Sequence, residues 1–169
     1  MRTLFIILFL LSYSTTYCQD NCPAIIDWKY LDTVDLYDKP GGKVIHQMKN
    51  DSANEDFLHL SILKQTDSHF YVSITMTVKK DSSTAWIKKA HYIGAYKRHE
   101  QFPMELTLYK NKKATDTDKI IITNWIPNLL TIEKFADKWV FVSLKQNGQT
   151  YIGWIQADEL CANSYTYCN

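Results

Sequence analysis

Histidine and cysteine are the residue types in this 169-residue chain that could most readily bind a metal or take part in catalysis. The five histidines are His46, His59, His69, His91 and His99. Their scattered spacing is not that of metal ligands, and no His-Glu-x-x-His motif occurs, so the sequence does not predict a metal site. A Gly-x-Ser-x-Gly element, a phosphate-binding loop and a dinucleotide fingerprint are absent as well. We therefore expect no catalytic residues, no cofactor and no enzymatic activity.

The first residues of the chain have the layout of a secretory signal. A short basic start is followed by an apolar run over residues 3–11, which is too short to span a bilayer as a helix. We expect cleavage after Cys18, so that residues 1–18 are removed and Gln19 becomes the mature N-terminus. Cleavage after Ser14 and a lipid anchor on Cys18 are the alternatives. The mature chain is then expected outside the cytoplasm, in the periplasm or secreted.

Charge and hydropathy argue against two further classes of function. The chain holds 19 Lys and Arg against 18 Asp and Glu, and Arg2 is the one charged residue of the expected signal, so its removal leaves 18 of each. A chain without net charge has no general attraction to nucleic acid. No second apolar stretch approaches membrane-spanning length. We expect neither a nucleic-acid partner nor a transmembrane segment.

Three cysteines outside the expected signal lie near the ends of the mature chain, where a covalent tie is more plausible than a nucleophile. They are Cys22, Cys161 and Cys168. In the loop-entropy model the small ring closed by Cys161 and Cys168 stabilises by about 2.5 kcal/mol, and a Cys22 to Cys161 tie by about 5 kcal/mol. Energetics thus favours the long tie, and proximity in sequence favours the short one. We expect the Cys161–Cys168 disulfide, since an exported chain meets oxidising conditions.

The elements that must position these side chains are strands. Short runs rich in β-branched and aromatic residues predict strands over residues 57–63, 69–78, 84–87, 119–123, 129–135, 138–144 and 150–155. The best turn signals lie at residues 40–42, 80–83 and 147–148. Residues 25–31 are the one short helix candidate. Strands at this spacing predict an all-β barrel or sandwich.

An internal repeat divides the chain in two. Residues 58–74 align without a gap on residues 128–144, with six identities in seventeen positions. The identities are Leu60 with Leu130, Ile62 with Ile132, Lys64 with Lys134, Asp67 with Asp137, Val72 with Val142 and Ser73 with Ser143. Upstream, VDLY (34–37) matches LTLY (106–109), and downstream AWI (85–87) matches GWI (153–155). The chain therefore holds two copies of one small β unit, which join near residues 96–102.

In content and order, both copies resemble the bacterial Src-homology-three domains. Such domains run from an opening strand through a Gly/Pro loop to an aromatic-rich strand and a Gly-Trp-Ile or Gly-Trp-Val element. The resemblance implies two small SH3-like five-stranded barrels in tandem, the first over residues 20–97 and the second over residues 100–169. There are departures: Ala85 replaces the usual Gly, the loop over residues 49–56 is long, and the second copy lacks the Gly/Pro loop.

The resemblance also implies an aromatic-lined groove in each copy. Tyr37 and Tyr109 end the opening strands, and Trp86 and Trp154 stand at the same point of the two copies. These four residues are the expected ligand-binding residues, and we expect both tryptophans to be partly buried. Because the second copy lacks the Pro-Gly loop, we expect Tyr37 to contribute more to binding than Tyr109.

The leading hypothesis is an exported, non-enzymatic binding module of the bacterial envelope. It would recognise a wall component, such as cell-wall peptide, or an envelope protein, because SH3 barrels bind extended peptides in aromatic grooves. The alternative is an inhibitor or immunity protein that blocks a secreted toxin or hydrolase with a loop such as residues 49–56.

Overall fold

The computed structural model describes residues 16–98, 105–115, 117–123 and 125–163. Thirteen strands, all paired antiparallel, form one hydrogen-bonded sheet, which confirms the expected all-β class. Within the described residues the one helical element is a short 3-10 turn, η1 (Ala157–Glu159). No helix in this part of the chain is long and apolar enough to cross a membrane.

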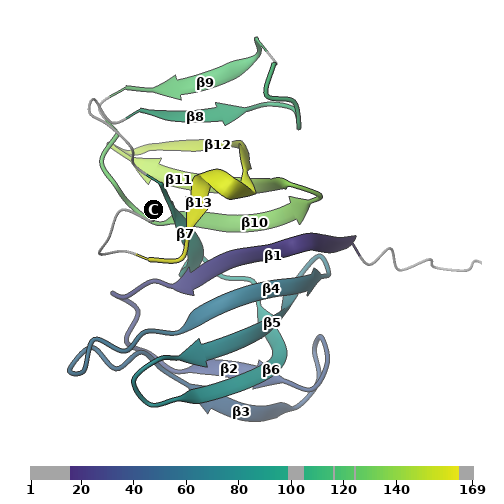
Figure 1. Cartoon of the computed structure of the whole chain (residues 1–169), viewed down its shortest axis with the longest axis vertical. Coiled ribbons are helices and arrows are strands. Elements are labelled where there is room, and N and C mark those ends of the chain that lie inside the picture. Colours follow the sequence, from purple (N-terminus) through teal and green to yellow (C-terminus); the bar gives the residue numbers. More distant parts are fainter. Residues whose placement is uncertain (1–15, 99–104, 116, 124, 164–169) are drawn as a thin grey trace, which may run out of the picture.

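Figure 1 shows the two copies stacked along the long axis of the molecule. The first copy contains β1 (Thr16–Ile26), β2 (Val34–Tyr37), β3 (Val44–Met48), β4 (His59–Gln65), β5 (His69–Met76) and β6 (Asp81–Lys88). The second contains β7 (Ile93–Lys97), β8 (Leu106–Tyr109), β9 (Lys119–Ile122), β10 (Leu130–Ala136), β11 (Trp139–Gln146), β12 (Gln149–Gln156) and β13 (Leu160–Cys161). The sheet runs in the order β3-β2-β6-β5-β4-β1-β7-β10-β11-β12-β8-β9, with β13 paired to β7.

Strand β7 belongs to both copies. It pairs with β1 through Gly94 and Ile25, and with β10 through Ala95 and Leu130. Further along, it also pairs with β13. In the first copy the last strand, β7, therefore returns to the first strand, β1. In the second copy β13 returns to β7 in the same way.

The backbone repeats as closely as the sequence does. Strands β4 and β5 carry an irregularity between Ile62 and Lys64, and β10 and β11 carry one between Ile132 and Lys134. These positions differ by seventy residues, which is the offset of the sequence alignment. The repeat predicted from the sequence is therefore also a repeat of strand register.

All seven strands predicted from residue type are present, with ends shifted by up to three residues. Two other predictions from residue type, one of a helix and one of the position of a turn, differ from the structure. Residues 25–31 do not form a helix: Ile25 and Ile26 belong to β1, and Asp27 starts a turn in which its carboxylate accepts a hydrogen bond from the Lys29 N–H at 3.0 Å. The β5–β6 turn covers residues 77–80, so it overlaps the predicted residues 80–83 only at Lys80, and β6 already begins at Asp81.

Strand β1 was not predicted, and it matters most to the architecture because it joins the copies. Its first residues, from Thr16, overlap the expected signal, so cleavage after Cys18 would leave a strand that starts at Gln19. Residues 1–15 lie outside the described residues, and the signal stays a prediction.

Alternation along the strands sends one face of each copy into an apolar core. The core includes Leu36, Leu60, Phe70, Val72 and Ile87 in the first copy, and Leu108, Leu130, Val140, Val142 and Ile155 in the second, all of them 3 % exposed or less. Because side chains alternate across a strand, the residues between them face outward.

Two glycines of the second copy lie where strands approach closely. A Cβ on Gly94 of β7 would stand 2.3 Å from the carbonyl oxygen of Leu130, so only glycine fits the β7–β10 pairing. A Cβ on Gly153 would stand 2.8 Å from the Cβ of Leu108, yet the first copy accommodates Ala85 at the equivalent position. Gly94 is therefore the more demanding of the two.

The cysteines are placed only in part. Cys22 on β1 and Cys161 on β13 are both buried. Cys168 lies outside the described residues, so the Cys161–Cys168 disulfide stays a prediction.

Candidate functional site

A row of aromatic side chains crosses the outer face of the first copy. Tyr37 on β2 stands opposite Trp86 on β6, Trp86 stands opposite Tyr71 on β5, and Tyr71 stands opposite Lys64 on β4. His69, two residues before Tyr71, shares its face. We call Tyr37, His69, Tyr71 and Trp86 the first ladder.

The rings of the first ladder touch one another in pairs. The centroids of Tyr71 and Trp86 are 5.2 Å apart, and those of Tyr37 and His69 are 5.7 Å apart in an edge-to-face arrangement. Both distances lie in the range where aromatic pairs attract. Tyr37, Tyr71 and Trp86 are half-buried, so each ring is supported on one side and open to solvent on the other.

The second copy repeats this arrangement with different rings. Tyr109 on β8 stands opposite Trp154 on β12, and Trp154 stands opposite Phe141 on β11. Phe141 and Trp154 are 5.1 Å apart, and Tyr109 meets Trp139 edge to face at 5.5 Å. We call Tyr109, Trp139, Phe141 and Trp154 the second ladder.

Lysine side chains lie over the rings of both ladders. In the first, the Lys64 ammonium is 5.6 Å from the Tyr71 centroid. In the second, Lys134 lies 4.9 Å from Phe141 and 5.4 Å from Trp154, and Lys112 lies 5.8 Å from Trp154.

A third lysine, Lys119, lies 6.0 Å from Tyr109. At these distances a cation is attracted to the ring face. Among the described residues, three lysines thus lie over rings of the second ladder and one over a ring of the first, although Lys112 also pairs with Asp137 at 3.4 Å.

The histidine of the first ladder behaves as an uncharged ring. His69 is only 7 % exposed, and its Nδ1 lies 2.8 Å from the hydroxyl of Ser68. Burial lowers the pKa of His69 below its usual value, and the charge of Lys88 lowers it further. At neutral pH the side chain is therefore neutral, which suits its place among aromatic rings. Its counterpart in the second copy is Trp139.

The four residues expected to bind ligand are brought together as two pairs. Tyr37 lies beside Trp86 in one ladder, and Tyr109 lies beside Trp154 in the other. Both tryptophans are half-buried, as expected. His69 and Trp139 were not predicted as members of these sites, although the seventy-residue offset relates them to each other and the two-residue period of a strand relates each to the next ring.

The long loop of the first copy is held in a fixed shape. The buried Asn50 side chain donates to the carbonyl oxygens of Asp27 at 2.9 Å and Tyr30 at 3.0 Å, and it accepts a bond from the Leu58 N–H. The buried Asp56 carboxylate accepts bonds from the N–H groups of Val78 and Lys79.

At the base of this loop Asp51 bridges Asp56 and makes an ion pair with Lys79 at 2.9 Å. A hydrogen bond from Asn54 and the contact with Lys79 lower the pKa of Asp51 to about 2. The loop therefore presents residues 52–55, all exposed, on a rigid base.

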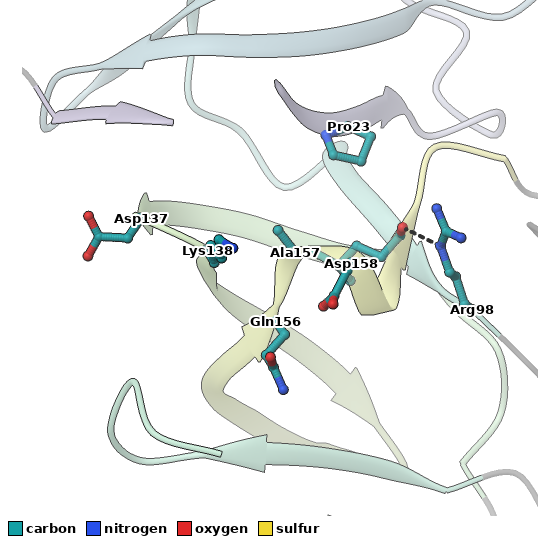
Figure 2. Close-up of a pocket in the computed structure, with 8 residues that line it drawn as sticks. Pro23, Arg98, Asp137, Lys138, Gln156, Ala157 and Asp158 are labelled. Carbon is teal, nitrogen blue, oxygen red and sulfur yellow. Dashed lines mark hydrogen bonds between the residues drawn. The ribbon is translucent and has the colours of Figure 1, made fainter. Parts of the chain in front are cut away.

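A cavity of about 310 Å³ lies between β1 and the end of the second copy. Its lining includes Pro23, Arg98, Asp137, Lys138, Gln156 and Asp158. Figure 2 shows Asp137 and Arg98 at opposite ends of the lining. The Arg98 Nε donates to the Leu160 carbonyl oxygen at 3.2 Å, so this side chain helps to hold β13 in place. The charged groups do not converge on one point, which makes this cavity a weaker candidate than the ladders.

No protein-family model matches the chain, and neither does any curated protein or any solved structure. Within the described residues there is also no cluster of histidine, cysteine and carboxylate side chains that could hold a metal ion.

Proposed function

We propose that the protein is an exported, non-enzymatic binding module of the bacterial envelope, which recognises a wall component or a protein partner through its two ladders. The observation that carries this proposal is the equivalent placement of four rings on the outer face of each copy. Flat aromatic rings offer large contact areas and lose little conformational entropy on binding. Half-buried rings are already held in position, which lowers the cost of binding further.

The proposal includes the architecture expected from the sequence, two SH3-like five-stranded barrels over residues 20–97 and 100–169. The recurrence of one pairing pattern supports two equivalent units, because β7 returns to β1 in the first copy and β13 returns to β7 in the second. In a closed barrel, the strand edges on which a secreted β-rich chain could aggregate would be hidden.

Two sites on one chain favour a ligand that is itself repetitive. Cell-wall peptides recur along a polymer, and two weak contacts on one polymer give an avidity beyond either contact alone. An extended peptide would lie across the rings as in other aromatic grooves.

The test is capture by the mature chain, from Gln19 onward, on purified cell wall and from envelope extract. Replacing Trp86 and Trp154 together by Ala removes one ring from each ladder, and we expect a loss of about 1 to 2 kcal/mol of binding free energy for each anchor. The matched control is Thr84→Ala with Ile152→Ala, which changes exposed residues two positions away on the same strands.

Melting temperatures of all variants show whether a change in binding reflects unfolding. If the double tryptophan variant binds wall and envelope proteins as tightly as the control variant, the ladders are not the binding site.

One observation favours the second candidate, an inhibitor or immunity protein. The loop over residues 49–56 is braced by Asn50 and Asp56 and exposes its tip, as a loop that enters an enzyme cleft must. Replacing residues 52–55 by Gly and Ser residues separates the two functions. Loss of a captured secreted enzyme in this variant, with capture retained in the tryptophan variant, would favour inhibition over wall binding.

A further inference from the structure

A larger recess lies where the connection from β6 to β7 crosses the second copy, on the same outer face of β11 as Phe141 of the second ladder. Its volume is about 610 Å³, which is within the usual range of small-ligand sites. We call it the junction groove, and its polar lining includes Asp27, Lys89, His91, Glu133, Ser143 and Lys145. The first three come from the first copy and its connection, and the others from β10 and β11, so neither copy forms the groove alone.

The walls of the junction groove are tied together by hydrogen bonds. The Lys89 ammonium donates to the Glu133 carbonyl oxygen at 2.8 Å, and the Thr131 hydroxyl donates to the His91 carbonyl oxygen at 2.9 Å. Both bonds join the connection to β10. The groove is therefore a preformed feature of the junction, which a ligand site requires.

Two of its charged side chains are also held from below. The Ser143 hydroxyl donates to Glu133 Oε1 at 2.7 Å, which orients this exposed carboxylate in the lining of the groove. The aliphatic stem of Lys89 is partly buried, and its ammonium lies 4.7 Å from the Phe70 centroid. Burial lowers the pKa of Lys89, while the charges of Asp67 and Glu133 oppose that shift. A ligand carboxylate would restore some of the polar surroundings that this ammonium has lost.

The repeat supplies an internal comparison. At the positions of Glu133 and Lys145 the first copy carries Leu63 and Thr75, while Ser143 is matched by Ser73. At these two positions, charged residues therefore occur only in the second copy, where the β6–β7 connection lies beside β10 and β11. A structural requirement of the fold would apply to both copies.

The lining contains charges of both signs. Carboxylates at Asp27 and Glu133 attract an ammonium group, and the ammonium groups of Lys89 and Lys145 attract a carboxylate. A neutral sugar would hydrogen-bond to these groups without compensating either charge, and a phosphate-rich ligand would be repelled by the two carboxylates. A ligand that carries one group of each sign is satisfied by both.

We propose that the junction groove is a second binding site, which takes a short peptide with a free ammonium group and a free carboxylate. The ammonium lies toward Glu133 and the carboxylate toward Lys145 and Lys89. None of the eight ladder residues lines this site, so it stands or falls independently of the function proposed above.

The experiment is an NMR titration of the mature chain with trialanine in four forms: free, N-acetylated, C-amidated and blocked at both ends. The free peptide should shift the amide signals of residues 89–91 and of β10 and β11 around Glu133, and blocking either end should weaken binding by about tenfold, as expected for loss of a charge-assisted hydrogen bond. Equal binding of all four forms, no binding of the free form, or shifts confined to the ladders would each overturn the proposal.

Variants assign the two ends of the peptide. Glu133→Gln should weaken binding of the free peptide about tenfold and leave binding of the N-acetylated form unchanged. Lys145→Ala should weaken binding of the free peptide to the same extent and leave binding of the C-amidated form unchanged. Thr75→Ala, at the position of the first copy that corresponds to Lys145, is the matched control and should change nothing. If Glu133→Gln weakens the free and the acetylated peptide equally, the ammonium does not bind at Glu133 and the proposal fails.

Discussion

The two copies have the same strand register but different outer faces. At equivalent positions the first ladder has His69 and the second has Trp139, and the second ladder also gathers Lys112, Lys119 and Lys134 around its rings. The backbone has thus been kept while the side chains that meet solvent have changed. Such a difference is what one would expect of two sites that share a mode of binding and differ in ligand preference.

The junction adds a second asymmetry, because β7 is needed by both copies. A fragment of residues 20–97 keeps this strand, whereas a fragment of residues 100–169 lacks it and leaves β10 and β13 without their partner. We expect circular dichroism dominated by strand in both fragments. Restoring β7, in a fragment of residues 89–169, should raise the melting temperature of the second copy by about 15 °C, or about 2 to 3 kcal/mol for a unit of this size.

Two results with these fragments would contradict the expected behaviour. A helix-dominated spectrum of either fragment would contradict the fold. Equal melting temperatures with and without residues 89–99 would show that β7 is not shared in the sense the pairing indicates.

A smaller change tests the same strand within the whole chain. Gly94→Ala places a Cβ against the Leu130 carbonyl oxygen, and we expect it to reduce the free energy of unfolding by about 3 kcal/mol, since backbone must move to make room. Gly153→Ala is the matched variant, and it should cost about 1 kcal/mol because the first copy already has Ala85 at this position. Chemical denaturation measures both, and a larger loss for Gly153→Ala would contradict the stated roles of the two glycines.

Much of this arrangement could be predicted from residue type alone. Alternating β-branched and aromatic residues gave strands such as β5 and β11, and the Asn147-Gly148 pair gave a hairpin in which both residues have positive φ, 53° and 76°. The equivalence of Tyr37 with Tyr109, and of Trp86 with Trp154, followed from treating the two copies as one pattern. Each of these inferences depends on neighbours in sequence or on the repeat.

What could not be predicted depends on contacts between distant segments. Strand β1 has no alternating pattern to mark it, since Ile25 and Ile26 are both buried, and its partners are provided by the tertiary fold. The junction groove brings Lys89 to Glu133 across forty-four residues, and no local signal gives that distance. The residues of β7 are compatible with a strand, but their strand propensity does not reveal that both copies share it.

The two ladders should differ in the ligand they prefer. The sequence favours the first, because only that copy has the Pro-Gly loop, and Tyr37→Ala should then weaken capture of a neutral ligand by about 1 to 2 kcal/mol and Tyr109→Ala by less. The lysines around the second ladder favour an acidic ligand there, so with an acidic wall peptide the order of the two variants should reverse. Added salt should reduce the difference for the acidic ligand and leave the neutral one unchanged. Identical losses for both variants with both ligands would mean that the ladders do not differ in preference.

The smallest expected effect isolates His69 from its counterpart Trp139, which does not titrate. The pKa of His69 is lower in the folded protein than in the unfolded chain, where it is about 6.5. Between these two pKa values the unfolded state binds more protons, so the free energy of unfolding decreases as pH falls below about 6.5 and is unaffected by this group above it. Urea denaturation at pH 7.5 and pH 5 should therefore show a smaller loss of stability in His69→Phe than in the parent chain. Asp51 does not interfere, because the stabilisation from its lowered pKa is lost only as pH falls from its usual value of 3.8 toward about 2, below the pH range compared. If the parent and His69→Phe lose the same stability between the two pH values, His69 is not a neutral ring held by burial, and this difference between the ladders disappears.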